Sequence, residues 1–201
     1  MKATLLALLL GTMANVLFAS PLTGVKLYQA VESGVYTISA SDGSEQSVGS
    51  AVAVTDSVLA TSCHIGGAAK GFKVKIGGKY YNAKIIYTNI KRDLCLLTVD
   101  HQRFKPVTML PSTEVKIGED VYAIGNPYGI EKSITRGIIS NKRLVDHAWV
   151  LQSDVTLEAG SSGGGLFNSD GKLIGIVYAG HRLKNIGFIM PTEWIQAGLA
   201  Q

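Results

Sequence analysis

The sequence predicts an all-β protein with two halves of six antiparallel strands each and a short C-terminal helix. Apolar and polar residues alternate with a period of two in short segments such as residues 72–76, and this period is typical of half-buried strands. Turn-forming clusters separate these segments at short intervals, as at residues 41–44, 77–78 and 169–171. Many short strands between turns indicate a sandwich or a barrel.

The first six strands are predicted at residues 35–40, 47–55, 58–61, 72–76, 80–88 and 94–99. The second six are predicted at residues 120–124, 133–141, 149–153, 164–168, 172–178 and 186–190. Residues 104–114 contain Pro106 and Pro111 and are predicted to connect the two halves. We therefore expect an N-terminal β-barrel over residues 20–108 and a C-terminal β-barrel over residues 109–201.

A helical pattern is seen only at the C-terminus. We expect Thr192 to cap a short helix that runs through Trp194, Ile195 and Leu199.

The first 19 residues have the pattern of a secretory signal peptide. Lys2 supplies the positive charge, residues 3–10 are apolar, and the small residues Ala19 and Ser20 precede Pro21. The apolar run is too short to span a bilayer, and a retained membrane anchor is the alternative. We expect cleavage after Ala19 and export to a bacterial periplasm or to the cell exterior, without stable membrane insertion.

The composition excludes several classes of function. The chain is 46% hydrophobic and 17% charged with a net charge of +4, which is ordinary for a soluble globular protein. Its basic residues are scattered and form no stripe, so nucleic-acid binding is not expected. The histidines and cysteines show no metal-ligand spacing such as C-x₂-C or H-E-x-x-H, so neither a metal site nor another cofactor is expected.

A glycine-rich run at residues 158–166 contains Ser162, the candidate nucleophile. A flexible turn is the alternative interpretation of such a run. A tight loop at this place would expose the hydroxyl and direct the backbone N–H groups of Gly160 and Ser162 into one concavity. Two N–H groups arranged in this way would stabilise an oxyanion.

A serine hydroxyl needs a base within hydrogen-bond reach, and His64 is the candidate among the four histidines because it ends a predicted strand. A surface histidine without a catalytic role is the alternative. Asp93 directly precedes an apolar strand and is the candidate to orient His64, with Asp100 and Asp154 as competitors. The order His, Asp, Ser occurs in one known class of serine hydrolases.

Four segments in this order resemble trypsin-like serine proteases of the chymotrypsin fold, and most closely the HtrA/DegP branch. They are residues 49–65, 92–97, 121–140 and 152–164. The resemblance implies two chymotrypsin-like barrels and an exported serine endopeptidase that hydrolyses polypeptide substrates through an acyl-enzyme. It implies that Ser162 attacks the carbonyl, that His64 transfers the proton, that Asp93 orients His64, and that Gly160 and Ser162 form the oxyanion hole.

The resemblance also implies a specificity pocket lined by Thr156, Tyr178, Ala179, Gly180 and Gly187. None of these residues carries a carboxylate, so we expect a preference for small apolar side chains. Related proteases usually append a peptide-binding PDZ domain. The chain ends after its short helix, so we expect the protease domain alone.

Cys63 precedes His64, and Cys95 follows Asp93 by two positions. If His64 contacts Asp93, the two sulfurs lie near each other, and the exported compartment permits a disulfide. We therefore predict a Cys63–Cys95 disulfide, with two buried free thiols as the alternative.

Two other functions stay open. Glu158 and Gly165 depart from the residues common in the family, which keeps a catalytically impaired binding protein on the same fold as one alternative. An extracellular adhesin or structural β-protein is the other. The sequence does not determine the oligomeric state.

Overall fold

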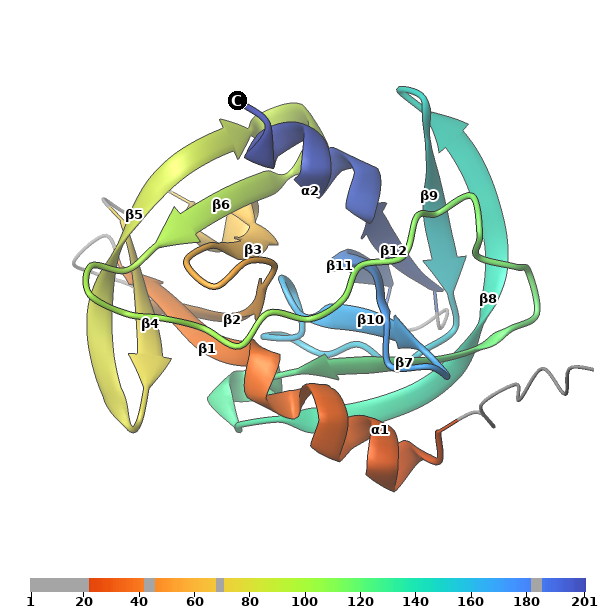
Figure 1. Ribbon diagram of the computed structural model, residues 1–201, viewed down its shortest axis with the longest axis horizontal. Coiled ribbons are helices and arrows are strands. Elements are labelled where there is room, and N and C mark those ends of the chain that lie inside the picture. The colour runs from red at the N-terminus through yellow and green to blue at the C-terminus, as the bar shows by residue number, and fades with distance from the viewer. Residues whose placement is uncertain (1–21, 42–45, 68–70, 182–185) are drawn as a thin grey trace, which may run out of the picture.

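The computed structural model describes residues 22–41, 46–67, 71–181 and 186–201 (Figure 1). The predicted signal peptide, residues 1–19, lies outside the described residues. Within them, no helix combines the length and the hydropathy needed to cross a membrane.

The first six strands close into a barrel in the order β1-β2-β3-β6-β5-β4. They are β1 (Val35–Ser41), β2 (Gln46–Ala53), β3 (Leu59–Ser62), β4 (Phe72–Ile76), β5 (Lys79–Asn89) and β6 (Leu94–Thr98). The second six close into a barrel in the order β10-β11-β12-β9-β8-β7. They are β7 (Asp120–Gly125), β8 (Ser133–Val145), β9 (Ala148–Ser153), β10 (Gly165–Asn168), β11 (Leu173–His181) and β12 (Ile186–Pro191).

All strand pairings within the barrels are antiparallel. The predicted fold class is therefore confirmed. The predicted domain boundary near residue 108 falls in the connection between β6, which ends at Thr98, and β7, which begins at Asp120. Short 3-10 turns interrupt the connections at η1 (Glu32–Gly34), η2 (Cys63–Ile65), η3 (Ile90–Arg92) and η4 (Pro127–Gly129).

The strand β8 is longer than the predicted residues 133–141. It continues to Val145 and pairs there with Ala148 of β9. The exposed Leu144 and Val145 lie in this extension. A hairpin that leaves the barrel loses one buried face, so its residues no longer show the alternation from which strands are predicted.

The helix α1 (Gly24–Val31) corrects the expectation that the only helix lies at the C-terminus. Thr23 caps it by accepting the N–H of Lys26, and Leu27 and Val31 are buried. Eight residues make little more than two turns, which is too short for a clear helical period. The helix α1 precedes the first barrel but lies against the second (Figure 1), where the Tyr28 hydroxyl donates to the carbonyl of Lys132 at 3.1 Å.

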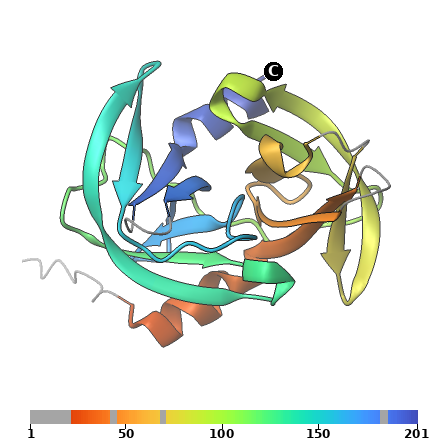
Figure 2. The same ribbon diagram turned by 180° about the vertical axis from the view of Figure 1, so that it is seen from behind.

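The helix α2 (Thr192–Leu199) runs where it was predicted, but Thr192 does not cap it. Thr192 is the first helical residue, and its hydroxyl donates to the carbonyl of Leu110 at 2.8 Å. The helix follows the second barrel yet packs on the first (Figures 1 and 2), and a Cβ on Gly198 would touch Tyr87 and Leu96. Each terminal helix therefore covers the barrel at the far end of the chain.

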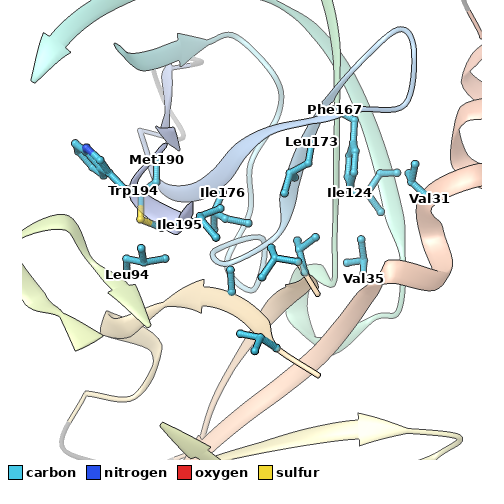
Figure 3. Packing of buried hydrophobic residues seen from close by; sticks show 14 of the residues in the cluster. Val31, Val35, Leu94, Ile124, Phe167, Leu173, Ile176, Met190, Trp194 and Ile195 are labelled. Carbon is cyan, nitrogen blue, oxygen red and sulfur yellow. The ribbon is translucent and has the colours of Figure 1, made fainter. Parts of the chain in front are cut away.

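A hydrophobic core shared by both barrels lies between them (Figure 3). Leu94 comes from the first barrel, Ile124 and Phe167 come from the second, and Val31 and Ile195 come from the two helices. Each barrel also has a core of its own. The shared core holds the barrels in one relative position, so residues that face each other across the seam keep a constant geometry.

Candidate active site

The predicted base and its predicted partner meet at one end of the first barrel. His64 lies in η2 directly after β3, and Asp93 lies between η3 and β6. Asp93 has a φ of 54°, in the left-handed region, which aspartate tolerates better than most residues do. This conformation ends the turn and starts β6 in a new direction.

The carboxylate of Asp93 binds His64 at two places. Its Oδ1 accepts the backbone N–H of His64 at 2.7 Å, and its Oδ2 lies 2.6 Å from the ring Nδ1. A carboxylate only accepts hydrogen bonds, so Nδ1 carries a proton, and in the neutral imidazole Nε2 is left as an acceptor. The other predicted candidates are elsewhere: Asp100 pairs with Lys84, and Asp154 accepts the N–H of Ile138.

A disulfide joins Cys63 to Cys95, as predicted. The N–H of Cys63 also donates to the carbonyl of Asp93 at 2.9 Å. The segment that carries the imidazole is thus tied to the segment that carries the carboxylate by one covalent bond and by backbone and side-chain hydrogen bonds.

Ser162 lies in the loop between β9 and β10 and approaches the first barrel closely. Its carbonyl accepts the N–H of Ser50 at 2.8 Å. The next residue, Gly163, has a φ of +80°, and a Cβ there would lie 1.9 Å from the carbonyl oxygen of Ser50. Only glycine fits such an approach, so Gly163 is required by packing between the barrels.

Gly160 also has a positive φ, +95°. Its N–H and that of Ser162 have no acceptor among the residues that the structure describes. Such N–H groups are able to bind an external oxyanion.

An open cleft of about 740 Å³ contains the three predicted triad residues His64, Asp93 and Ser162. The side chain of His64 is 50% exposed and that of Asp93 only 19%, so the imidazole faces the cleft and the carboxylate lies behind it. Tyr178 also lines the cleft. Burial raises the pKa of its phenol, and the charge of Asp93 raises it further.

Two of the residues predicted for the specificity pocket, Tyr178 and Thr156, line different cavities. Tyr178 lines the cleft that holds the candidate triad, whereas Thr156 and Ser161 line a separate apolar pocket of about 50 Å³. Gly187 is buried on β12 and pairs with Gly180 of β11. The backbone of Ala179 lies in β11, and its side chain lies outside the described part.

Leu157 is a residue that the sequence analysis missed. A Cβ on Gly187 would lie 2.7 Å from Cδ1 of Leu157. The leucine side chain therefore occupies the space above this glycine. The sequence gives only a weak signal for this contact between Leu157 and Gly187, namely an apolar residue between Thr156 and Glu158.

Within the described residues, no three His, Cys, Asp or Glu side chains are grouped as metal ligands.

The sequence matches the family model of the trypsin-like peptidase domain over residues 49–176. A relative from Halomonas elongata, described as a probable periplasmic serine endoprotease that is DegP-like, is 36% identical over 137 residues. That alignment covers 65% of this chain and 29% of the relative, so the chain spans less than a third of its length.

Two solved structures are similar in fold. The HtrA-type protease AlgW with a tripeptide has a TM-score of 0.77 and 26% identity, and the match covers 87% of this chain and 61% of AlgW. The active form of the Rv3671c protease from M. tuberculosis has a TM-score of 0.79 and 21% identity, over 96% of this chain and 93% of that one. The second similarity concerns the fold alone.

Proposed function

Because the chain belongs to the trypsin-like peptidase domain family, we propose that it is a serine endopeptidase with the triad His64, Asp93 and Ser162. The observation that carries the proposal is the geometry at the end of the first barrel. Asp93 binds both the backbone and the ring of His64, and this pair shares one open cleft with Ser162.

Each residue has a defined step in this reaction. Nε2 of His64 takes the proton of the Ser162 hydroxyl while the oxygen attacks the peptide carbonyl, and it then delivers this proton to the leaving amine. Asp93 holds the ring in the tautomer that leaves Nε2 free and stabilises the imidazolium that forms. In the second half of the reaction, His64 takes a proton from water as the water attacks the acyl-enzyme, and it then returns this proton to Ser162.

The N–H groups of Gly160 and Ser162 would bind the oxyanion of the tetrahedral intermediate. Loss of one such donor slows comparable enzymes by about 10²- to 10³-fold.

A fluorophosphonate probe tests the proposal, because it reacts only with an activated serine. We expect the purified protein to be labelled and Ser162→Ala to be inert. Ser161→Ala is the matched control, since the Ser161 hydroxyl accepts the N–H of Glu158 and Ser161 lines the other pocket. An unlabelled wild-type protein would favour the impaired binding protein instead.

We further propose polypeptide substrates and an exported location, from the similarity to the Halomonas elongata relative, a probable periplasmic endoprotease, and from the signal-like residues 1–19. Sequencing the N-terminus of the protein recovered from a periplasmic extract tests the export, and Ser20 is the first residue expected.

The specificity that we propose is for small apolar residues on the acyl side of the cleaved bond, because Leu157 fills the space above Gly187. Leu157→Ala should raise kcat/KM for peptides with leucine or phenylalanine at this position by about tenfold, the effect typical of one or two methylene groups in a pocket. Faster cleavage after arginine than after alanine or valine by the wild-type protein would contradict this specificity.

A further inference from the structure

Ser50 lies outside the cleft, in β2 of the first barrel, and its side chain is completely buried. Its hydroxyl donates to the carbonyl of Gly160 at 2.8 Å. The same oxygen accepts the N–H of Asn126 at 2.8 Å and the side-chain amide of Asn126 at 3.2 Å. A serine hydroxyl has one donor and two acceptor positions, so all of its hydrogen-bonding capacity is used and it has a single orientation.

The backbone of Ser50 makes a second contact with the same loop. Its N–H donates to the carbonyl of Ser162 at 2.8 Å, and its own carbonyl accepts the hydroxyl of Thr61 at 2.7 Å. Ser50 therefore binds the carbonyl groups of the two residues whose N–H groups are proposed to form the oxyanion hole.

The N–H of a residue lies in one planar peptide unit with the carbonyl of the preceding residue, so hydrogen bonds to these carbonyls also orient the N–H groups. The peptide units on both sides of a residue fix its φ and ψ. For Gly160, the preceding carbonyl, that of Ala159, accepts the N–H of Tyr128 at 2.6 Å, and its own carbonyl accepts the Ser50 hydroxyl. Since glycine has no Cβ to restrict it, such external bonds are needed to hold its φ at +95°.

Ser162 is held in the same way. The preceding carbonyl, that of Ser161, accepts the N–H of Gly164 at 2.9 Å, and the carbonyl of Ser162 accepts the N–H of Ser50. Of the four hydrogen bonds that fix the two oxyanion donors, two come from Ser50.

Asn126 completes the arrangement and links it to both barrels. It is fully buried, its side-chain amide donates to the carbonyl of Tyr36 at 3.0 Å, and its side-chain carbonyl accepts the N–H of Lys132. The Ser50 hydroxyl is thus held by a residue that is itself anchored in the seam between the barrels.

From these contacts we propose that Ser50 is a positioning residue for the oxyanion hole, acting across the barrel interface on Gly160 and Ser162. The proposal rests on the proposed peptidase function. Ser50 makes no contact with the substrate in this proposal. Loss of the Ser50 hydroxyl should therefore slow the chemical step and leave substrate binding almost unchanged.

The test compares the wild-type protein with Ser50→Ala on a chromogenic peptide. The substitution removes the hydroxyl contact with Gly160 and keeps the backbone contact with Ser162. We expect kcat to fall about 10- to 100-fold, less than for a donor that is lost completely, while KM changes less than about twofold. The inhibition constant of a peptide boronate, which places a tetrahedral oxygen in the oxyanion hole, should rise by the same factor as kcat falls.

Ser112→Ala is the matched control. Ser112 is also completely buried, and its hydroxyl also donates to one group, Glu193, and accepts from another, the N–H of Trp149. Both variants should lower the melting temperature, but only Ser50→Ala should lower kcat. Equal kcat values for the two variants, or a change confined to KM, would show that Ser50 serves stability alone.

Two further measurements keep the result interpretable. Ser50→Cys keeps a side chain of similar shape, but its thiol is only a weak donor. It replaces Ser50→Ala in the same comparison if the alanine variant does not fold. The ¹⁵N–¹H resonance of Gly160 should shift in the Ser50 variants and not in Ser112→Ala, whether or not the protein turns over. An inert wild-type protein would therefore count against the peptidase function, whereas an unmoved Gly160 resonance would overturn the role of Ser50.

Discussion

Asp93 illustrates how much of the candidate chemistry depends on single residues. It adopts a left-handed conformation and presents one carboxylate oxygen to the backbone of His64 and the other to its ring. Asparagine tolerates this conformation equally well, so a substitution can change the charge without changing the backbone.

We expect Asp93→Asn to lower kcat by about 10⁴-fold, because the amide would favour the wrong tautomer of His64 and could not stabilise its cation. The melting temperature should change little. Asp100→Asn is the control, since Asp100 is exposed and pairs with Lys84, and it should keep full activity. Steady-state kinetics on one peptide measures both, and an Asp93→Asn enzyme within tenfold of the wild type would refute the assigned role.

Gly163 and Gly118 form a matched pair for testing the close approach of the barrels. Their φ values are +80° and +88°, but a Cβ at Gly163 would collide with Ser50, whereas a Cβ at Gly118 meets nothing within 4 Å. Gly118→Ala should cost about 1–2 kcal/mol from the backbone conformation alone. Gly163→Ala adds overpacking of about 1–3 kcal/mol or more. Urea unfolding measures the free energy of unfolding of both variants. Equal losses of stability would mean that the backbone around Ser50 moves to accommodate the added methyl group.

Glu119 gives a pH-dependent prediction. Burial raises the pKa of this carboxyl above its ordinary value of 4.5, and its Oε1 is buried with no partner in the described part of the chain. The folded state therefore holds the proton more tightly than the unfolded state, and stability falls as the pH rises through the raised pKa.

Glu119→Gln should accordingly raise the melting temperature at pH 7 by up to about 3 °C, on the scale typical of a domain of this size. The gain should vanish well below pH 4.5, where both folded and unfolded states are protonated. The exposed Glu114→Gln is the control. A gain that persists at low pH would show that the effect is not due to ionisation.

At the scale of elements, the disulfide connects the turn η2 with the strand β6. The two cysteines are 32 residues apart in sequence. A cross-link that closes a loop of this length contributes about 3–4 kcal/mol by the chain-entropy model. Cys63 is also adjacent to His64 in the sequence, and Cys95 follows Asp93 by two positions.

The double variant Cys63→Ala, Cys95→Ala should therefore lose about 3–4 kcal/mol of the free energy of unfolding and part of its kcat. Denaturant titration and peptide kinetics measure the two effects. Dithiothreitol should lower the stability of the wild-type protein and leave the double variant unchanged. If the reductant affects both equally, the stabilisation does not come from this bond.

At the scale of the whole molecule, two features predict that both barrels unfold together. The barrels share one hydrophobic core, and each of the helices α1 and α2 packs on the barrel at the far end of the chain. Leu94 is fully buried in the shared core, and Leu94→Ala should cost about 2–5 kcal/mol. Hydrogen exchange should show the same loss of protection at Ile124 in the second barrel as at residues in the first. The control Ile85→Ala, at a half-exposed position, should stay within about 0.5 kcal/mol of wild type. Two separate unfolding transitions would show that the barrels are independent.

The sequence alone was sufficient for the number and order of the strands and for the order of the candidate residues, and it favoured the pairing of Cys63 with Cys95. These features are local patterns or follow from short separations along the chain: alternation records one buried face, and the cysteines flank the very residues expected to touch. The helix α1 and the extension of β8 were not predictable, because one is too short for a period and the other leaves the core.

Only the tertiary structure decided which distant groups meet at the seam between the barrels. Nothing in the pattern around Ser50 indicates that its hydroxyl contacts Gly160, 110 positions later, or that Leu157 lies over Gly187. Local sequence records what each strand buries, but contacts across the seam depend on how two closed barrels pack against each other. That packing is set by the shared core as a whole, and no single segment encodes it.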